Sequence, residues 1–187
     1  MQLESAIKKR RSVKVYKDKK PDWRDIIECI DNIRYTPMAG NIMSLKVILV
    51  SDNEKIKKLA QAAQQDFIAS AYYVVVFCSD PDYTISLYEE RGKKYLEQQA
   101  GAGIQTFLLS LVDKGLSSCW VGHFNDKLVK DILKIPANIN VEAMCPIGYE
   151  TSVRWRKENK KKSRLDTMLF FEEYNRKKMK TPKKLEV

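Results

Sequence analysis

The sequence of 187 residues has few of the residues on which many catalytic sites depend. His123 is the single histidine, and the four cysteines form no C-x-x-C pair. Zinc sites and redox dithiols need closely spaced histidine or cysteine ligands, and no G-x-S-x-G motif accompanies His123 to suggest a serine-type triad. The composition therefore disfavours metal-dependent and triad-type chemistry, and we predict no metal site.

Long apolar runs are also absent. No stretch of about 18 uncharged apolar residues occurs, and the N-terminal segment MQLESAIKKRRSVKVY carries charges where a signal peptide is apolar. These features predict a soluble, cytoplasmic protein that does not associate with a membrane. Each cysteine (Cys29, Cys78, Cys119 and Cys145) lies among apolar residues, so we expect buried, reduced thiols.

The chain does contain enough core-forming residues for one domain, together with an excess of positive charge. Hydrophobic residues make up 44% of the composition, and 34 basic against 24 acidic side chains give a net charge of +10. The length favours a single domain, and the charge should attract an anion. Composition alone leaves open whether that anion is a nucleic acid, a membrane or a phosphorylated cofactor.

Helical and strand patterns alternate along the chain. The strongest strand pattern is the apolar run YYVVVFC at residues 72–78, which suits a strand buried on both faces. The widest helical stripe begins near Tyr95 and ends at Gly115. Pro146 favours a sheet edge or a bulge within the last strand. The other expected elements are helices at residues 3–9, 22–33, 52–65 and 126–134 and strands at residues 45–50, 118–121 and 141–149.

This alternation predicts an α+β or α/β sandwich of about four or five strands. Beyond Glu150 the composition changes to mostly lysine and arginine, which we interpret as an arm and not as a second domain. We therefore expect one domain over residues 1–174, followed by a basic, frayed tail over residues 175–187.

Two basic clusters carry side chains suited to an anion. Arg10, Arg11, Ser12 and Lys14 combine two guanidinium groups, a hydroxyl and an ammonium within five residues, which could wrap a phosphate. Residues 162–164, Lys-Ser-Arg, repeat this chemistry near the other end of the chain. A solvated basic helix end would explain the first cluster equally simply if it stood alone.

Two glycine-containing stretches are suited to a planar ligand. In the loop Pro37-Met38-Ala39-Gly40-Asn41, the Asn41 amide offers both a donor and an acceptor, although glycine and asparagine also occur in ordinary turns. In the stretch from Gly115 to Gly122, the glycines would let backbone amides approach a ligand closely. A helix C-cap followed by a tight strand end would give the same pattern.

In their order along the chain, these stretches resemble the nitroreductase family of flavoproteins. The family's opening R-R-S-x-R/K segment is similar to residues 10–14, and its P-S-A-x-N-x-Q-P-W loop is similar to residues 37–41. Its G-L-x-S-C-W-I-G helix end is matched nearly in full by residues 115–122. An I-G-Y strand end and a basic K-S-R-L segment follow at residues 147–149 and 162–165. The resemblance covers residues 3–174.

The resemblance implies a nitroreductase-like α+β fold, a three-layer α/β/α sandwich whose central, mostly antiparallel sheet has four or five strands. It also implies a homodimer with an FMN site at each side of the interface and a C-terminal arm that reaches the partner subunit. By position, Arg10, Ser12, Lys162 and Arg164 would hold the FMN phosphate. The cofactor-binding residues expected on this basis are Arg10, Arg11, Ser12, Lys14, Pro37, Met38, Ala39, Asn41, Met43, Trp120, Val121, Gly122, Lys162 and Arg164.

The implied roles differ among these residues. Lys14 and Asn41 would face the isoalloxazine edge and the ribityl chain, and the backbone around Val121 and Gly122 would approach N5 and O4. Because two-electron reduction puts negative charge near N1 and C2=O, a cation such as Lys14 would stabilise the reduced flavin. No protein side chain is expected to act as a catalytic nucleophile.

Some positions depart from the family pattern. Met38 replaces a small serine, and residues 43–45, Met-Ser-Leu, replace Q-P-W. The segment between Ser79 and Gln99 is short, although the family forms its flavin lid there. Three tyrosines of this segment could stack on a flat substrate or lie exposed on an amphipathic helix: Tyr83, Tyr88 and Tyr95.

The function that the resemblance implies is an FMN-dependent oxidoreductase with NAD(P)H as the electron donor. It would work by ping-pong hydride transfer through flavin N5 to a small electron-poor acceptor such as a nitroaromatic or a quinone. One alternative keeps FMN but changes the reaction to a flavin-consuming or dehalogenating one. The other is a basic nucleic-acid-binding protein, which ranks last because the chain has no aromatic-rich basic motif or helix-turn-helix pattern.

Overall fold

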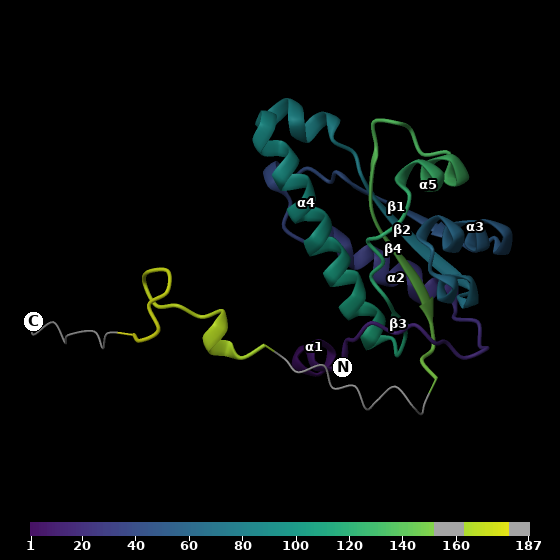
Figure 1. Cartoon of the computed structure of the whole chain (residues 1–187), viewed down its shortest axis with the longest axis horizontal. Coiled ribbons are helices and arrows are strands. Elements are labelled where there is room, and N and C mark those ends of the chain that lie inside the picture. Colours follow the sequence, from purple (N-terminus) through teal and green to yellow (C-terminus); the bar gives the residue numbers. More distant parts are fainter. Residues whose placement is uncertain (152–162, 180–187) are drawn as a thin grey trace, which may run out of the picture. The chain divides into compact units, whose positions relative to one another are not determined.

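The structure, a computed structural model, describes residues 1–151 and 163–179, and the chain divides into two compact units, residues 1–151 and residues 152–187. The first unit is an α+β fold built around one sheet, as predicted (Figure 1). Its elements are α1 (Leu3–Lys9), α2 (Trp23–Asp31), η1 (Asn32–Tyr35), η2 (Ala39–Asn41), β1 (Leu45–Val50), α3 (Asn53–Ala63), η3 (Asp66–Ser70), β2 (Tyr73–Ser79), α4 (Asp82–Asp113), β3 (Ser117–Ser118), α5 (Asp126–Leu133) and β4 (Asn140–Gly148). The described part of the second unit contains η5 (Leu165–Thr167).

The sheet is antiparallel and has the strand order β1-β2-β4-β3. Every residue of β2 is buried, because helices cover both faces of this central strand. One face packs against α2 and α4 through Val75 and Phe77, and the other packs against α3 and α5 through Val74 and Val76. Figure 1 shows α4 on one side of the sheet and α3 and α5 on the other. The predicted three-layer sandwich is confirmed.

Three helices begin at side chains that cap them. The carboxylate of Asp22 accepts from the Arg24 N–H at 2.9 Å, and that of Asp52 accepts from the Lys55 N–H at 2.8 Å. The amide oxygen of Asn125 accepts from a backbone N–H of α5 in the same way. Such bonds satisfy donors that the first turn of a helix leaves free, which explains why the sequence located these helix starts well.

Helix α4 begins at Asp82, so the predicted start near Tyr95 was wrong. The helix bends at Glu89, whose φ of 48° and ψ of −135° are not helical, and the first segment folds back on the second. Gly92 permits this close approach, since a Cβ there would lie 2.8 Å from the Thr84 carbonyl oxygen. The bend breaks the continuous apolar stripe from which a helix is recognised.

The strand predicted at residues 118–121 is shorter than expected. Only Ser117–Ser118 forms β3, and Val121 returns to the sheet as an isolated bridge to Met144. Residues 119–120 depart from the ladder between these two points.

Pro146 lies in β4, between β2 and β3, so its predicted position at an edge or bulge was wrong. The register shift between β2 and β4 lies at residues 77–78 instead. Met144, two residues before the proline, exchanges both backbone hydrogen bonds with Val121, so the N–H that proline lacks would point toward the same side. Residues 119–120 are not paired with β4 at this point, so the missing N–H of Pro146 does not remove a hydrogen bond from a regular strand.

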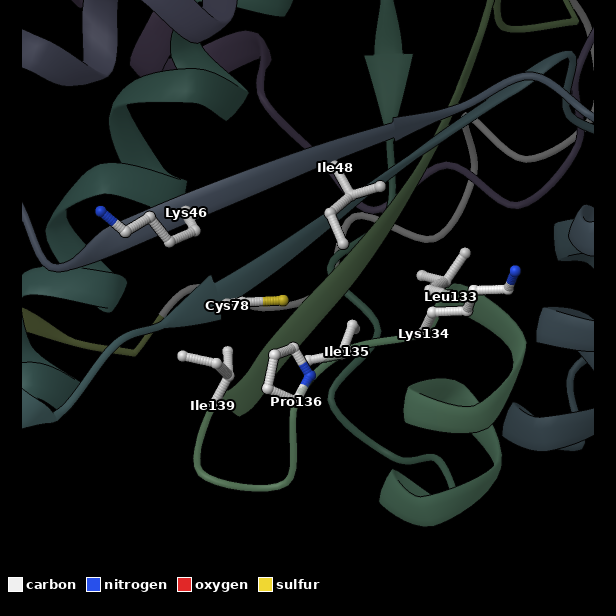
Figure 2. A pocket seen from close by; sticks show the side chains of 8 residues that line it. All are labelled: Lys46, Ile48, Cys78, Leu133, Lys134, Ile135, Pro136 and Ile139. Atoms are coloured by element: carbon white, nitrogen blue, oxygen red, sulfur yellow. The ribbon is translucent and has the colours of Figure 1, made fainter.

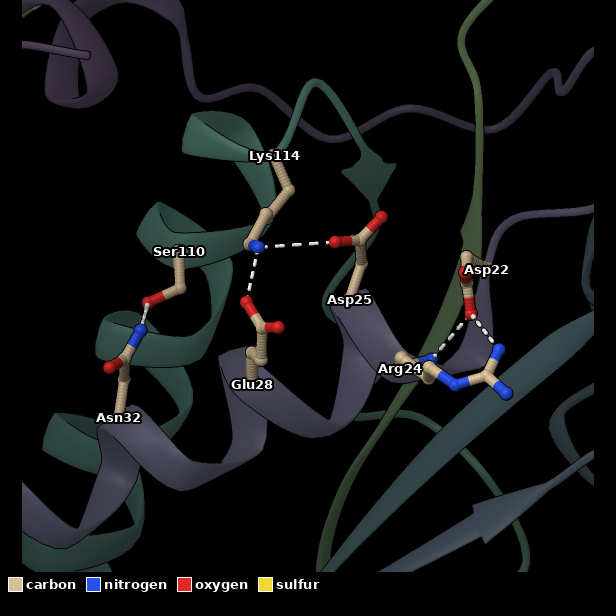
Figure 3. A network of polar contacts seen from close by, with 7 residues as sticks. All are labelled: Asp22, Arg24, Asp25, Glu28, Asn32, Ser110 and Lys114. Carbon is tan, nitrogen blue, oxygen red and sulfur yellow. Dashed lines mark hydrogen bonds and ion pairs between the residues drawn. The ribbon is translucent and has the colours of Figure 1, made fainter.

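Polar contacts along one side fasten α2 to α4 (Figure 3). The ammonium of Lys114 pairs with Asp25 at 3.1 Å and with Glu28, and these carboxylates raise the pKa of Lys114 above its usual range. One helical turn away, the Asn32 amide donates to Ser110 Oγ at 3.0 Å. Such partly exposed pairs contribute little stability, but they orient α2 along the long helix.

The four cysteines are buried, as expected. Burial raises the pKa of Cys29 and of Cys145 to about 12 and that of Cys78 to about 11. Within residues 1–151 and 163–179, no helix is both long enough and apolar enough to cross a membrane.

Candidate functional site

The first basic cluster leaves α1 and runs beside β3. Ser12 forms a parallel bridge with Ser118, and the Val13 N–H donates to the Ser118 carbonyl oxygen at 3.0 Å. Val13 is buried, whereas Ser12 and Lys14 are exposed. Because side chains alternate along an extended chain, Ser12 and Lys14 lie on the same, solvent-facing side.

Tyr16 fixes the basic segment against β4. Its hydroxyl donates to the carbonyl oxygens of Val13 at 2.8 Å and Pro146 at 3.1 Å. Its ring covers Gly148, where a Cβ would lie 2.7 Å from two ring carbons. Burial raises the pKa of the Tyr16 phenol well above its usual range, so the hydroxyl stays protonated and keeps donating. The position of the basic cluster thus depends on buried contacts with β4.

The four residues of the basic cluster differ in their partners. The Arg11 guanidinium is engaged by the carboxylate of Glu150, with Nε 2.9 Å from Oε1 and a second bond from Nη2. Arg10, Ser12 and Lys14 make no ion pair or hydrogen bond through their side chains with any residue that the structure describes. Two cations and a hydroxyl without a carboxylate suit an anionic ligand, so this donor set fits a flavin nucleotide, which carries a phosphate and gains negative charge on its ring when reduced.

The glycine-tryptophan stretch, residues 115–122, lies at the same corner of the sheet. The N–H and carbonyl of Val121 are both bonded to Met144 at 2.9 Å, so this residue has no free amide for a ligand. The Gly122 N–H has no hydrogen-bond partner among the described residues, and Gly122 and Trp120 are exposed. If a backbone amide here contacts a ligand, the Gly122 N–H is the available donor.

Residues 62–67, from the end of α3 into η3, contact Lys14 and the residues that directly follow the 115–122 stretch. The Gln65 side chain donates to the His123 carbonyl oxygen at 3.5 Å, and the Asn125 N–H donates to the Ala62 carbonyl oxygen at 2.8 Å. On the other side, the Lys14 ammonium lies 5.0 Å from the centre of the Phe67 ring. Tyr16, Gln65 and Phe67 carry no signal in the sequence, because such contacts between distant residues leave no local pattern.

The second predicted ligand stretch, residues 37–41, forms η2 and its entrance. Gly40 and Asn41 have φ values of 59° and 57°, and a Cβ on Gly40 would lie 2.8 Å from the Tyr88 hydroxyl. Asn41 is exposed. Directly after the loop, the buried Ser44 hydroxyl donates to Gln99 Oε1 at 2.7 Å. This buried pair occupies the place where the resembled family has Q-P-W.

Within one chain, the structure does not bring the loop of residues 37–41 close to the basic cluster of residues 10–14. Residues 37–41 lead into β1, whose first residue pairs with Ser79 at the end of β2, whereas Ser118 pairs with Ile147, which pairs with Tyr73 at the start of β2. Three strand spacings of about 4.8 Å and six residues of about 3.4 Å each separate these points by about 14 Å across and about 20 Å along the sheet. They occupy diagonally opposite corners.

The second basic cluster is only partly described. Lys162 lies outside the described residues. Arg164 belongs to the second unit, where its guanidinium pairs with the Asp166 carboxylate at 2.6 Å.

A separate pocket of about 190 Å³ lies between strands β1 and β2 and the end of α5 with the loop that follows it (Figure 2). Its lining is apolar apart from two lysine side chains and comprises Lys46, Ile48, Cys78, Leu133, Lys134, Ile135, Pro136 and Ile139. None of the expected cofactor-binding residues contributes to this lining, so the pocket does not correspond to the predicted site.

The regions described above also match known proteins in sequence. The family model described as "Nitroreductase family" matches residues 7–70 and 60–149. A protein of Archaeoglobus fulgidus, provisionally named NADH dehydrogenase/NAD(P)H nitroreductase, is 29% identical over 145 residues, which cover 75% of this chain and 80% of the relative.

Solved structures show the same fold. A nitroreductase family protein of Streptococcus pneumoniae TIGR4 superimposes with a TM-score of 0.79 at 22% identity, over 90% of this chain and 98% of the other. A structure named as an FMN-dependent nitroreductase, from Clostridium difficile R20291, superimposes with a TM-score of 0.69 at 23% identity, over 80% of this chain and 88% of the other.

Proposed function

Because the chain belongs to the nitroreductase family, we propose that it is an FMN-dependent oxidoreductase that passes electrons from NAD(P)H to a small electron-poor acceptor. The observation that carries this proposal is the set Arg10, Ser12 and Lys14, which has no acidic partner among the described residues and lies beside the unpartnered Gly122 N–H. A phosphate-bearing, planar cofactor satisfies both groups. The relative from Clostridium difficile, which is named FMN-dependent, supports the choice of cofactor.

The proposed roles follow from the position of each group. Arg10 and Ser12 hold the FMN phosphate. Arg11 is already paired with Glu150, which compensates its charge, so it does not contact the phosphate directly. Lys14 faces the edge of the ring system, and the Gly122 N–H donates to it.

Bound FMN supplies the two-electron chemistry, accepting electrons from NAD(P)H and releasing them to an acceptor such as a nitroaromatic or a quinone. The protein supplies binding, orientation and charge. Lys14 compensates the negative charge that the reduced cofactor carries, and the exposed Trp120 covers apolar surface beside the ring. No side chain needs to act as a nucleophile.

We further propose that two chains complete each site. Asn41 and Lys14 belong to the same predicted site, yet they occupy opposite corners of the sheet in one chain. A second copy that places its loop of residues 37–41 against the basic corner of the first brings them together. Tyr35, Met43 and Leu87, near this loop, expose apolar surface that such a contact would cover.

The cytoplasm is the proposed compartment. Four buried thiols suit a reducing environment, in which they persist as cysteines.

A flavin-binding experiment tests the function. The purified protein, titrated with FMN under anaerobic conditions, should quench flavin fluorescence with one FMN per chain. NADH or NADPH should then bleach the bound flavin, and a panel of nitroaromatics and quinones should restore its colour. If the protein is colourless once unbound FMN has been removed, the proposal is overturned. If neither nucleotide bleaches the bound flavin, NAD(P)H is not the electron donor.

A further inference from the structure

Lys14 is an exposed cation whose described partner is an aromatic ring. Its ammonium lies 5.0 Å from the centre of the Phe67 ring, within the range of a cation–π interaction. No carboxylate pairs with it among residues 1–151 and 163–179. The long side chain of a lysine is otherwise free to adopt many rotamers, so this contact restricts where the charge lies.

The choice of an aromatic ring instead of a carboxylate has a chemical consequence. A carboxylate would hold the ammonium but would also neutralise its charge toward any other anion. The face of an aromatic ring attracts the cation through its quadrupole and carries no net charge. Phe67 therefore holds the ammonium in place and leaves its full charge available to a ligand.

Phe67 is itself held firmly. It packs against the core on the α3 and α5 side of the sheet, and it belongs to η3. The neighbouring Gln65 side chain is bonded to the carbonyl oxygen of His123, the residue after Gly122. The segment that carries the ring thus contacts Lys14 on one side and the residue that follows Gly122 on the other.

We propose that Phe67 is a positioning residue that holds the Lys14 ammonium at the flavin edge and thereby strengthens binding of reduced FMN relative to oxidised FMN. This inference rests on the proposed function, because it needs FMN beside Lys14. Phe67 acts through Lys14 and does not itself contact the reacting atoms.

The test compares Phe67→Leu, which keeps an apolar side chain but removes the ring, with Phe67→Tyr, which keeps the ring. The quantity measured is the ratio of the FMN dissociation constants in the oxidised and reduced states, obtained from binding titrations or from the midpoint potential of the bound flavin. Phe67→Leu should lower this ratio about two- to fivefold, the range that one exposed cation–π contact supplies. Phe67→Tyr should leave it unchanged.

Two controls separate positioning from general stability. Phe124→Leu removes a second partly buried ring of the same core cluster that does not contact Lys14, and it should leave the ratio unchanged. In a Lys14→Met background, Phe67→Leu should have no further effect. The inference is wrong if Phe67→Leu weakens the binding of oxidised and reduced FMN equally. It is also wrong if Phe67→Leu lowers the ratio as much in the Lys14→Met background as in the wild type, because the ring then acts independently of Lys14.

A measurement without flavin distinguishes this failure from failure of the proposed function. In the protein free of FMN, the ring should shift the NMR signals of the Lys14 Cε protons upfield, and Phe67→Leu should abolish that shift. Absence of the shift overturns the inference whatever the protein binds. If the shift is present and the protein binds no FMN, the proposed function fails, and with it the role assigned to Phe67.

Discussion

The two corners of the sheet that carry the predicted ligand stretches are built differently. At the β3 corner, the basic cluster is fastened through a backbone bond to Ser118 and through the partly buried Tyr16. At the β1 corner, residues 37–41 form a loop with two consecutive positive φ values at Gly40 and Asn41, pressed against the Tyr88 hydroxyl. One corner positions charge on a rigid support, and the other presents an amide on an exposed, conformationally restricted loop.

This difference indicates that the two corners have separate roles in the proposed site. Charged groups bind a phosphate well only if their positions are held, which favours a support with buried contacts. A loop that presents its backbone and Asn41 outward is suited to contact another surface. In the proposed function, that surface is the basic corner of a second chain, and the predictions below test this division.

The largest expected effect is on the charged corner. Replacing Arg10 and Ser12 together by alanine should weaken FMN binding at least about 100-fold, because hydrogen bonds to a charged group contribute about 1.5–3 kcal/mol each. His123→Ala should change the affinity less than about threefold, since His123 contacts the chain through its carbonyl oxygen. Fluorescence titration with FMN measures both. Equal losses in the two variants would contradict a phosphate site at the basic cluster of residues 10–14.

Mixed dimers test whether the corners act in different chains. An Arg10→Glu chain and an Asn41→Ala chain should each bind FMN poorly by themselves. When the two are combined as a heterodimer with different affinity tags, one site should receive both intact corners, and about half of the wild-type FMN should bind tightly. A heterodimer that binds no more FMN than either parent would show that the two corners do not combine across chains.

Gly148→Ala tests how much the packing of Tyr16 against Gly148 at the β3 corner contributes to stability. A Cβ there would lie 2.7 Å from the Tyr16 ring, and such overpacking costs about 1–3 kcal/mol of unfolding free energy. Chemical denaturation measures the loss. Gly101→Ala is the matched control, because a Cβ at Gly101 meets nothing within 4 Å, and it should not destabilise the chain. The prediction is wrong if Gly148→Ala costs as much in a Tyr16→Ala background.

Gly40→Ala tests the β1 corner and should have the smallest effect. The positive φ of Gly40 makes alanine unfavourable by about 1 kcal/mol, and the added Cβ also meets the Tyr88 hydroxyl at 2.8 Å. Tyr88→Phe removes that oxygen. Combining the two changes should therefore recover the contact part of the loss and leave the backbone part, as measured by thermal unfolding. A double variant as unstable as Gly40→Ala alone would show that the hydroxyl is not the obstacle.

Much of the fold was predictable from local patterns. The predicted helix starts coincide with the caps at Asp22, Asp52 and Asn125, and an uninterrupted apolar run predicted β2, because both features depend on neighbouring residues. The start of α4 was not predictable in this way. Its first segment is held by the fold-back at Glu89 and Gly92, a contact between two helical segments that no periodicity records.

The sequence predicts which residues form the candidate site, but it does not predict how they are arranged. The order of the motifs along the chain identified residues 10–14, 37–41 and 115–122 as belonging to one family. It did not show that Arg11 is engaged by Glu150, or that the Val121 amide is bonded to Met144 and only the Gly122 N–H remains available. These assignments depend on partners far away in sequence.

The sequence by itself determined the family, the α+β class, most helix starts and the presence of two basic clusters. These properties follow from residue types and from contacts within a few positions of each other. Only the tertiary structure decided that residues 37–41 and the basic cluster lie at opposite corners of the sheet, and that Lys14 rests on Phe67. The physical reason is that strand order and register are set by how the whole core packs, and no local stretch of the chain contains that information.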